Sequence, residues 1–502
     1  MKSNLNLAKD EFLKIAEVGK VIPIILEIFG GHETPVGLYE KIAKNHTDTF
    51  LLESAEQGVW SRYSFIGVSA FSKITAHSSG ISFTNSAVLP SGASASGSPL
   101  SIIDQIQQSW KLEELAELPP LTSGMVGFFA WDVIREIEKL PDAKPSPYSH
   151  PLIQLQMVQD IIVMDHKDNR LLLISNCYCG QASDFEAEYE GAVSRIEKMF
   201  SEISLPTVPE FAFRKDKESA QVESNISKED FIAAVNRGKE YVKAGDVFQV
   251  VLSQRFDVAI SASALDLYRE LRAINPSPYM YLLNLTDEKG SYSIVGSSPE
   301  ALVKVSNGHA IMHPIAGSRP RGTSPKEDQD LAESLLDDKK ERAEHLMLVD
   351  LARNDLLKVS RPESVSVTEF MKVERFSHIM HLVSTVESEL ESGTSLIDVL
   401  RATFPAGTLS GAPKPRALQI IEELEPSNRG IFGGVVGYVD FAGNSDLAIA
   451  IRTAFIRDGK AHIQAGAGIV LDSNPEAEFQ ETINKSSAGV AAVTRANNLF
   501  GK

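Results

Sequence analysis

Strand-like segments in the second half of this sequence cluster as hairpins and do not alternate strictly with helices. They lie at 247–255, 279–285, 292–296, 301–305, 365–370, 382–387, 434–440, 447–456 and 461–465. Consecutive strands at this spacing pair as antiparallel hairpins, because a parallel pair needs a long crossover between its strands. We therefore expect an α+β fold with large mixed or antiparallel β-sheets and flanking helices.

Helical segments and one change of composition suggest how the chain is divided. Helices are expected at 227–244, 263–273, 326–351, 394–402, 413–424 and 475–486. The stretch 203–224 contains Pro206, Pro209 and a cluster of charges, which is typical of a linker. At 502 residues the chain exceeds what a single hydrophobic core usually supports. We predict a β-rich N-terminal domain over 1–215 and a larger domain over 225–495.

Charge and cysteine content exclude several classes of function. The chain carries 67 acidic and 49 basic residues, a net charge of −18, which argues against a nucleic-acid or anionic-membrane surface. The apolar stretch 21–29 is too short to span a bilayer. Cys177 and Cys179 are too few for a disulfide framework and have no partners at zinc spacing. We therefore expect a cytoplasmic protein, in which an anionic substrate would need a metal, a Lys or an Arg.

The segment 465–470 is rich in glycine and is predicted to form a turn that leads into a helix beginning at Pro475. Glu478, Glu481 and Lys485 have the spacing i, i+3, i+7, so they share one face of that helix. Beside a loop whose backbone a ligand can approach, two carboxylates and an ammonium are typical of a small-anion site with a hard cation such as Mg²⁺. A solvated helix face with an internal Glu–Lys pair is the better explanation of such a stripe in isolation.

A second acidic pair lies on the segment 326–355, which we predict as one long helix. Glu341 and Glu344 are again at i, i+3, and an apolar run begins immediately after them, which places the pair at the margin of buried surface. Mg²⁺ commonly takes one or two protein carboxylates and completes its octahedron with water and substrate oxygens. The two Glu-x-x-Glu pairs are therefore predicted to face one cavity and to hold Mg²⁺.

Several blocks of the sequence together resemble one family, the chorismate-utilising enzymes. Their motifs are highly specific, occur in order over 225–495, and comprise 244–253, 296–300, 314–322, 341–355, 405–414 and 465–485. The segment 51–54, Leu-Leu-Glu-Ser, extends the resemblance into the N-terminal part. The resemblance implies the α+β fold of that family and an Mg²⁺-dependent reaction on chorismate.

Two positions distinguish the branches of this family. Isochorismate and salicylate synthases carry a lysine that activates water where this sequence has Gln249, and a neutral amide cannot act as that base. Aminodeoxychorismate synthases carry a nucleophilic lysine where this sequence has Ala316, which offers no nucleophile. The resemblance therefore favours the branch that forms anthranilate, the first step of tryptophan biosynthesis. Aminodeoxychorismate synthase component I is the alternative.

The resemblance also implies which residues bind metal and substrate. Glu344 and Glu481 are expected to bind Mg²⁺, with Glu341 and Glu478 supporting the metal and its waters. Arg452, predicted within an apolar strand, matches the arginine that holds the enolpyruvyl carboxylate in bidentate fashion. The other expected substrate contacts are Gly317, Ser318, Thr408, Phe432, Gly466, Ala467, Gly468 and Lys485. Ser318 replaces the usual threonine and keeps its hydroxyl, whereas Phe432 lacks the hydroxyl of the tyrosine found in many relatives.

The expected catalytic residues are Glu300, His381 and Gln249. Glu300 matches the glutamate that protonates the departing ring hydroxyl, a role that requires a raised pKa, which burial supplies. His381 matches a histidine near the same hydroxyl, although a core histidine satisfied by hydrogen bonds is the simpler explanation of such a residue. In the implied reaction, ammonia adds to the ring as the hydroxyl leaves, giving aminodeoxyisochorismate, and pyruvate is then eliminated.

The source of ammonia implies a partner. The sequence has no Gly-x-Cys-x-Gly nucleophile motif, and both cysteines lie in other contexts. The resemblance implies a separate glutamine amidotransferase subunit in a heterotetramer, and the chain alone is expected to use free ammonia.

The resemblance implies feedback inhibition as well. Glu53, Ser54, Pro278, Tyr279 and Met280 resemble the tryptophan pocket of the family. A strand end and a proline turn would explain each segment singly, but not their joint match. A site shared by two domains suits allostery, because its occupancy can change their relative packing.

Overall fold

The computed structural model describes residues 4–31, 33–54, 62–113, 115, 118–141, 143–146, 148–206, 212–214, 220–375 and 379–500. Within these ranges no helix combines the length and the apolar character that crossing a bilayer requires.

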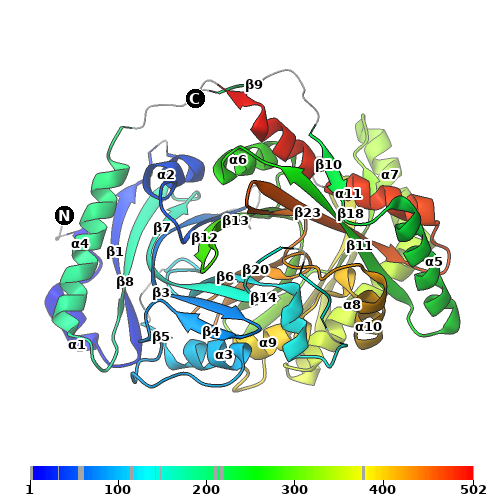
Figure 1. The fold of residues 1–502 in the computed structure, drawn as a ribbon. Helices are drawn as coiled ribbons and strands as arrows, with labels where there is room; N and C mark the ends of the chain where they lie inside the picture. The colour runs from blue at the N-terminus through cyan, green and yellow to red at the C-terminus, as the bar shows by residue number, and fades with distance from the viewer. Residues whose placement is uncertain are drawn as a thin grey trace.

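Two long antiparallel ladders make up most of the molecule, and both begin at the strand pair β3 (Tyr63–His77) and β7 (Ile153–Asp165) (Figure 1). The first ladder continues from β3 through β2 (Thr49–Glu53), β12 (Tyr279–Asp287), β13 (Gly290–Ser298), β22 (Thr453–Arg457), β23 (Lys460–Ile469) and β11 (Gln249–Ala259). The second continues from β7 through β6 (Met125–Phe129), β20 (Val435–Val439), β21 (Ser445–Ile449), β14 (Ala301–Ser306), β15 (His309–Met312) and β18 (Ile379–Glu389).

Shorter strands extend the edges of these ladders. They are β8 (Arg170–Tyr178), β1 (Lys20–Phe29) and β5 (Lys111–Leu112) beyond β7, β4 (Gly80–Phe83) beside β3, β16 (Ile315–Pro320) and β17 (Ser366–Arg375) beside β18, and β10 (Val222–Ser224) and β19 (Gly411–Ala412) beside β11. The short strands β9 (Phe213–Arg214) and β24 (Leu499–Phe500) pair separately. Among the described strands only β1 and β5 pair in parallel, so the predicted α+β class is confirmed.

The two ladders enclose one apolar core, and helices cover their outer faces. The enclosed core includes Phe50, Val126, Ile294 and Val436 from four different strands. A second cluster packs beneath α1 (Lys9–Ile15), α2 (Pro35–Ile42), α4 (Phe185–Ile203), α6 (Ala264–Ile274) and α11 (Pro475–Asn497). The largest packs beneath α3 (Pro99–Ser109), α5 (Lys228–Ala244), α8 (Lys339–Leu357), α9 (Leu396–Thr403) and α10 (Lys414–Leu424).

The N-terminal and C-terminal parts of the chain share both ladders. Strand β2 pairs with β12 through Met280↔Glu53, and β6 pairs with β20 through Gly437↔Gly127. Residues from both parts of the chain, such as Glu53 and Met280, therefore line one cavity. The division into domains over 1–215 and 225–495 stays a prediction.

The long helix predicted over 326–355 is wrong, because the chain breaks at Asp338. Helix α7 (Pro325–Asp337) ends there and α8 begins there. The Asp338 carboxylate accepts hydrogen bonds from the backbone N–H groups of Lys340 and Glu341, which is N-capping. This cap places Glu341 in the first turn of α8.

Two further local predictions are wrong. The glycine-rich segment is the end of strand β23, paired with β11 as far as Val250↔Ile469, and not a turn. The strand predicted over 447–456 is two strands, β21 and β22, separated at Arg452, whose φ of 49° lies in the left-handed region. The break lets β21 pair with β14 while β22 pairs with β13.

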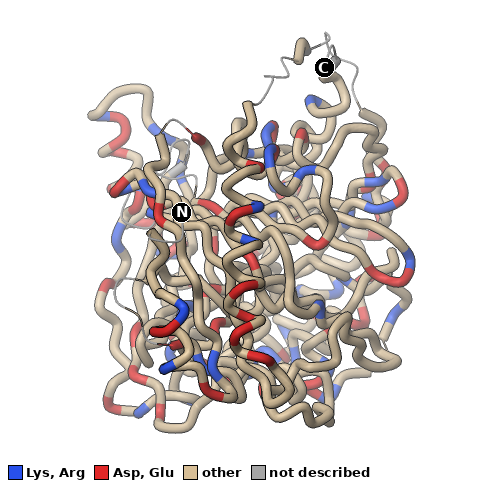
Figure 2. The backbone as a smooth tube through the Cα atoms, turned by 90° about the vertical axis from the view of Figure 1, so that its left-hand side faces the viewer, with Lys and Arg blue, Asp and Glu red and all other residues tan. Residues whose placement is uncertain are grey.

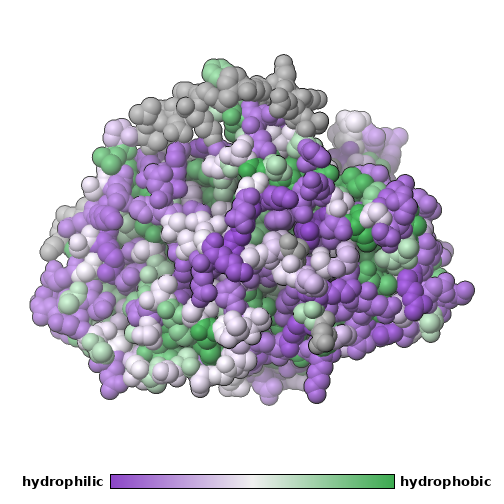
Figure 3. Space-filling model, in the orientation of Figure 1, coloured by the Kyte–Doolittle hydropathy of each residue, from purple (hydrophilic) through white to green (hydrophobic). Residues whose placement is uncertain are grey.

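Charged residues occur throughout the fold (Figure 2). Lys and Arg are interspersed with Asp and Glu in the view of Figure 2. The face seen in Figure 3 is largely hydrophilic, with hydrophobic residues in separate small areas.

Candidate active site

Glu300 lies in the connection between β13 and β14 and is held by a neighbouring loop. The Thr408 hydroxyl donates a hydrogen bond of 3.0 Å to Glu300 Oε1. Burial raises the pKa of the Glu300 carboxyl to about 7, and this exceeds the opposing effects of Thr408, Lys485 and Arg452. At pH 7, about half of the Glu300 carboxyl groups therefore carry a proton that they can donate.

Arg452 provides one of the two cations that act on Glu300. Its guanidinium is mostly removed from water, and burial lowers its pKa while the Glu300 charge raises it. Arg452 Nη1 donates a hydrogen bond of 3.1 Å to Asn275 Oδ1. The left-handed backbone at this non-glycine residue stores strain of a kind often found at functional sites.

Lys485 provides the second cation, from helix α11. Its ammonium donates to the backbone oxygen of Gly466 at 3.0 Å and pairs with the Glu481 carboxylate at 2.7 Å. The side chains of Lys485 and Glu481 remain 49% and 46% exposed. These two residues therefore lie where the site meets solvent, whereas Glu300 lies deeper.

His381 is positioned by strand β16. Its Nδ1–H donates a hydrogen bond of 2.8 Å to the Gly317 oxygen, which fixes the tautomer of the ring. Burial lowers the pKa of His381, so the ring is neutral near pH 7. Gly317 has φ +68°, and a Cβ there would lie 3.0 Å from Glu341 Oε2. Glycine at this position lets β16 approach the acidic end of α8.

Gln249 lies at the beginning of β11, beneath the same helix. Its Nε2 donates a hydrogen bond of 3.3 Å to Glu344 Oε1. Its Oε1 is buried and has no hydrogen-bond partner among the described residues. A Cβ at Gly468, on the neighbouring strand, would lie 2.1 Å from Gln249 Nε2, so glycine leaves the space that this side chain occupies.

The two acidic pairs lie within the first two turns of α8 and α11. Burial and the nearby Glu344 raise the pKa of Glu341. Burial likewise raises the pKa of Glu478, with Glu481 adding to this effect and Lys340 of α8 opposing it. The effect of Lys340 on Glu478 indicates that the two helix ends lie near one another.

These pairs offer only carboxylate oxygens, which suit a hard divalent cation. In the described part of the chain, no three His, Cys, Asp or Glu side chains converge closely enough to hold a metal ion. Mg²⁺ commonly takes one or two protein carboxylates and completes its shell with other oxygens, and carboxylates of this kind suit it.

The remaining predicted contacts differ in their surroundings. Ser318 pairs with His381 across β16 and β18. Ala467 is fully buried and pairs with Leu252 in the ladder. Phe432 lies in the largest core cluster with its ring 5.6 Å from the Arg429 guanidinium. Phe432 is therefore held by the packing around Arg429.

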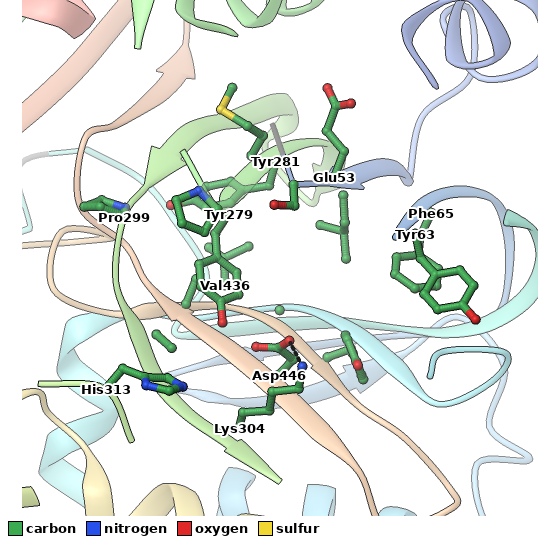
Figure 4. A pocket seen from close by; sticks show the side chains of 18 of the residues that line it. Glu53, Tyr63, Phe65, Tyr279, Tyr281, Pro299, Lys304, His313, Val436 and Asp446 are labelled. Carbon is green, nitrogen blue, oxygen red and sulfur yellow. Dashed lines mark ion pairs between the residues drawn. The ribbon is translucent and has the colours of Figure 1, made fainter. Parts of the chain in front are cut away.

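A separate cavity of about 210 Å³ is lined by all five residues predicted for a tryptophan pocket, Glu53, Ser54, Pro278, Tyr279 and Met280 (Figure 4). The strand pairing of β2 with β12 brings these two segments together. The Ser54 hydroxyl is buried and has no hydrogen-bond partner among the described residues. The Glu53 carboxylate accepts hydrogen bonds from Tyr268 and, at 2.8 Å, from Arg272.

Sequence reasoning missed other residues around this cavity. Lys304 and Asp446 form an ion pair of 3.6 Å on adjacent strands of its wall, and His313 lies beside them (Figure 4). No motif marked these positions. Lys304 and Asp446 are paired across the strands β14 and β21, whereas His313 follows β15.

The connection between β13 and β14, which contains Glu300, lies between two cavities. Pro299 and Ala301 line the large cavity, while Glu300, between them in sequence, lines a smaller one of about 40 Å³ together with Thr408. Ala301 and His313 line both cavities. A ligand in the large cavity would therefore contact the segment that carries Glu300.

The chorismate binding enzyme family model matches residues 48–490, which is most of the chain. The chain belongs to the chorismate-binding enzyme family. Anthranilate synthase component 1 of Arthrobacter globiformis is 48% identical over 98% of this chain and 93% of its own length. The same protein of Mycolicibacterium smegmatis is 46% identical over 98% of this chain and 94% of its own length.

A solved structure agrees. Anthranilate synthase component I of Streptococcus pneumoniae is 34% identical, covers 92% of this chain and 99% of its own chain, and has a TM-score of 0.76. The menaquinone-specific isochorismate synthase of Escherichia coli, at 18% identity and a TM-score of 0.69, shares the fold. Within the chorismate-binding enzymes, the chain therefore belongs to the anthranilate synthase component 1 branch.

Proposed function

We propose that this chain is the synthase subunit that converts chorismate and ammonia into anthranilate and pyruvate. The observation that carries the proposal is the buried Glu300 carboxyl, whose pKa is raised to about 7 and which feels the charges of two cations, Lys485 and Arg452. Chorismate has two carboxylates and a ring hydroxyl that must leave. Two fixed cations and one neutral acid match those three groups.

Substrate binding follows from the chemistry of these side chains. Arg452 would hold the enolpyruvyl carboxylate through its planar fork of donors. Lys485 and the backbone of the β23 segment 466–468 would hold the ring carboxylate near the mouth of the site. Glu300 would then donate its proton to the departing ring hydroxyl, with neutral His381 positioned nearby as a hydrogen-bonding group.

Gln249 would orient the attacking ammonia. Its buried Oε1 has no hydrogen-bond partner among the described residues, and a buried acceptor without a partner is costly. An N–H of ammonia would satisfy this oxygen. Because an amide is not a base, Gln249 would leave the lone pair of ammonia available to attack the ring.

Glu344 and Glu481 would hold Mg²⁺, with Glu341 and Glu478 as supporting carboxylates. When bound, the ion would supply positive charge for the ring carboxylate and offset the repulsion within each acidic pair. The ion would also compete with Lys485 for the Glu481 carboxylate, because Lys485 and Glu481 form an ion pair of 2.7 Å.

A glutamine amidotransferase subunit, component 2, would supply the ammonia in a heterotetramer. Tryptophan would inhibit the enzyme from the large cavity, whose wall includes the two residues flanking Glu300. Both cysteines are buried free thiols, which favours a reducing, cytoplasmic location.

Aminodeoxychorismate synthase component I is the competing assignment within the family. Ala316, on β16, pairs with Leu382 and is 9% exposed, so this position offers a methyl group where that enzyme needs a nucleophile. A non-aromatic aminated product from chorismate would favour that assignment instead.

The assay for this function combines chorismate, MgCl₂ and an ammonium salt and follows anthranilate by its fluorescence. We expect anthranilate to form, and EDTA to abolish its formation until Mg²⁺ is restored. Glu481→Gln should lower turnover by a factor of at least about 100, since metal charge contributes several kcal/mol to such reactions.

Glu476→Gln, an exposed residue in the first turn of the same helix, is the matched control and should keep wild-type turnover. No anthranilate from the wild-type chain would reject the function. Full Mg²⁺-dependent activity of Glu481→Gln would reject only its metal role.

Ser54→Ala should weaken inhibition by tryptophan. A hydrogen bond to a charged amino-acid group contributes about 1.5–3 kcal/mol, so the half-inhibiting tryptophan concentration should rise roughly 10- to 150-fold. Uninhibited turnover should not change. Ser64→Ala is the control, because Ser64 is buried on the adjacent strand and bonds His166, away from the cavity. Equal sensitivity of Ser54→Ala and wild type would argue against this pocket.

A further inference from the structure

The first half of helix α11, which carries the residues proposed to bind metal and substrate, has a polar buried face. The helix packs on strands β23 and β11 (Figure 1). In its first half the buried residues are Glu478, Thr482 and Ser486, whereas the buried apolar residues of α11 follow position 491. Phe479 adds an apolar contact, with its ring 5.8 Å from that of Phe231 on α5. Apolar contact has no preferred direction, so it does not by itself fix how the helix is rotated about its axis.

Strand β11 supplies a directed contact to this face through Gln254. Gln254 Nε2 donates a hydrogen bond of 2.5 Å to the Thr482 hydroxyl, and both residues are fully buried. The Thr482 hydroxyl in turn donates to the Phe479 oxygen at 2.7 Å, so it acts as donor and as acceptor. Gln254 Oε1 accepts a hydrogen bond of 2.9 Å from the Ser224 hydroxyl. The Gln254 amide is therefore bonded at both ends, which fixes its orientation.

Thr482 lies in the middle of the functional face of α11. It follows Glu481 directly, and it lies four residues after Glu478 and three before Lys485, a spacing that brings side chains together on a helix. A second bond from this face to a strand runs from the Lys485 ammonium to the Gly466 oxygen at 3.0 Å. Lys485 is proposed to bind substrate, so this bond is exchanged during the reaction. The bond between Gln254 and Thr482 can stay in place meanwhile.

Burial makes this bond selective for one setting of the helix. Each residue of an α-helix turns it by about 100°, so even a small rotation moves the Thr482 hydroxyl away from Gln254. The Gln254 N–H would then be buried without an acceptor, which costs more than an ordinary hydrogen bond gains. Buried polar groups that are fully paired therefore favour a single arrangement of the elements they join.

We propose that Gln254 is a positioning residue for the reaction. Through Thr482 it fixes the rotation of the first half of α11, so that Glu481 and Lys485 face the site together. This inference rests on the proposed function, and it adds the residue that sets the geometry of the metal and carboxylate contacts. Gln254 acts through the helix and not on the reacting atoms.

The test uses Thr482→Val in the full-length chain, which removes the hydroxyl and keeps the shape of the side chain. Steady-state assays with chorismate, MgCl₂ and ammonium salt give kcat and KM, and titration calorimetry gives the affinity for Mg²⁺ alone. We expect KM for chorismate and Kd for Mg²⁺ each to rise at least about fivefold, as the loss of one hydrogen bond would produce. The kcat at saturation should stay within about twofold of the wild type, because binding lost equally from ground and transition states appears in KM.

Three further variants separate positioning from stability. Thr482→Ser keeps the hydroxyl and should retain the wild-type KM and Mg²⁺ affinity. Thr494→Val is the matched control on the same helix, because the Thr494 hydroxyl bonds the Val490 oxygen at 2.9 Å within α11. Gln254→Met combined with Thr482→Val leaves neither partner unpaired, so the urea concentration at half-unfolding should return towards the wild-type value while KM stays raised.

Wild-type KM and Mg²⁺ affinity in Thr482→Val would overturn the proposal, as would equal losses in Thr494→Val. Recovery of KM along with stability in the double variant would also overturn it, since stability alone would then explain the defect. Absence of anthranilate from the wild type would reject the proposed function, and the Mg²⁺ titrations would still decide the role of Gln254.

Discussion

Glu300→Gln should lower the turnover number by roughly 10²- to 10⁴-fold, the usual contribution of a positioned general acid. The amide keeps the size of the side chain and can still accept the Thr408 hydrogen bond, which is 3.0 Å in the wild type. The loss should therefore appear in kcat for anthranilate formation with saturating chorismate and ammonium, and chorismate should still bind.

The pH profile gives the same prediction a second readout. The pKa of Glu300 is about 7 in the folded chain, so the protonated form needed for donation disappears as pH rises above that value. Wild-type turnover should fall on this alkaline limb, and the residual turnover of Glu300→Gln should lack it. Glu188→Gln is the control, since burial also raises the pKa of Glu188, but this residue lies on α4. Wild-type turnover of Glu300→Gln, or an unchanged alkaline limb, would contradict the assignment.

Arg429→Met should destabilise the fold by about 3–5 kcal/mol, because it leaves a buried charge without its partner. Arg429 is 1% exposed and donates to Glu425 Oε1 at 2.6 Å and Oε2 at 2.9 Å. It also donates to the backbone oxygens of Leu409 at 2.6 Å and Val251 at 2.8 Å. The Glu425 carboxylate receives the Ser253 N–H and hydroxyl, both at 2.8 Å. The free energy of unfolding is measured in urea.

A surface pair of similar type provides the control. Arg353 contacts Asp350 at 3.1 Å on α8, and its side chain is 48% exposed. Arg353→Met should cost less than about 1 kcal/mol, because water screens such pairs. Since Leu409 follows Thr408, Arg429→Met should also lower turnover by displacing the hydroxyl that binds Glu300. Equal losses of stability in the two variants would contradict the importance assigned to the buried network.

Local sequence patterns located most strands and helices but failed where a distant contact decided the backbone. The segment 465–470 has the composition of a turn, yet ten residues of β11 pair along β23 and keep the segment extended. The break at Asp338 follows from a side-chain cap that competes with a continuous helix in the same sequence. Arg452 interrupts a strand because β21 and β22 pair with different neighbours.

The candidate site shows a similar division. The family resemblance named Glu300, Arg452 and Lys485, which lie far apart in the sequence. It did not name Arg272, which binds Glu53. Arg272 lies on helix α6, and only the packing of that helix brings it to Glu53.

The sequence by itself determined the α+β class, the family and the identity of the residues proposed for chemistry, because turns, alternation and motifs are encoded over short stretches. Only the tertiary structure decided that burial raises the pKa of Glu300 to about 7, that Gln249 has a buried oxygen without a partner among the described residues, and that Glu53 and Met280 line one cavity. A pKa and a surface both depend on what distant segments remove from water, and that depends on how the strands are paired.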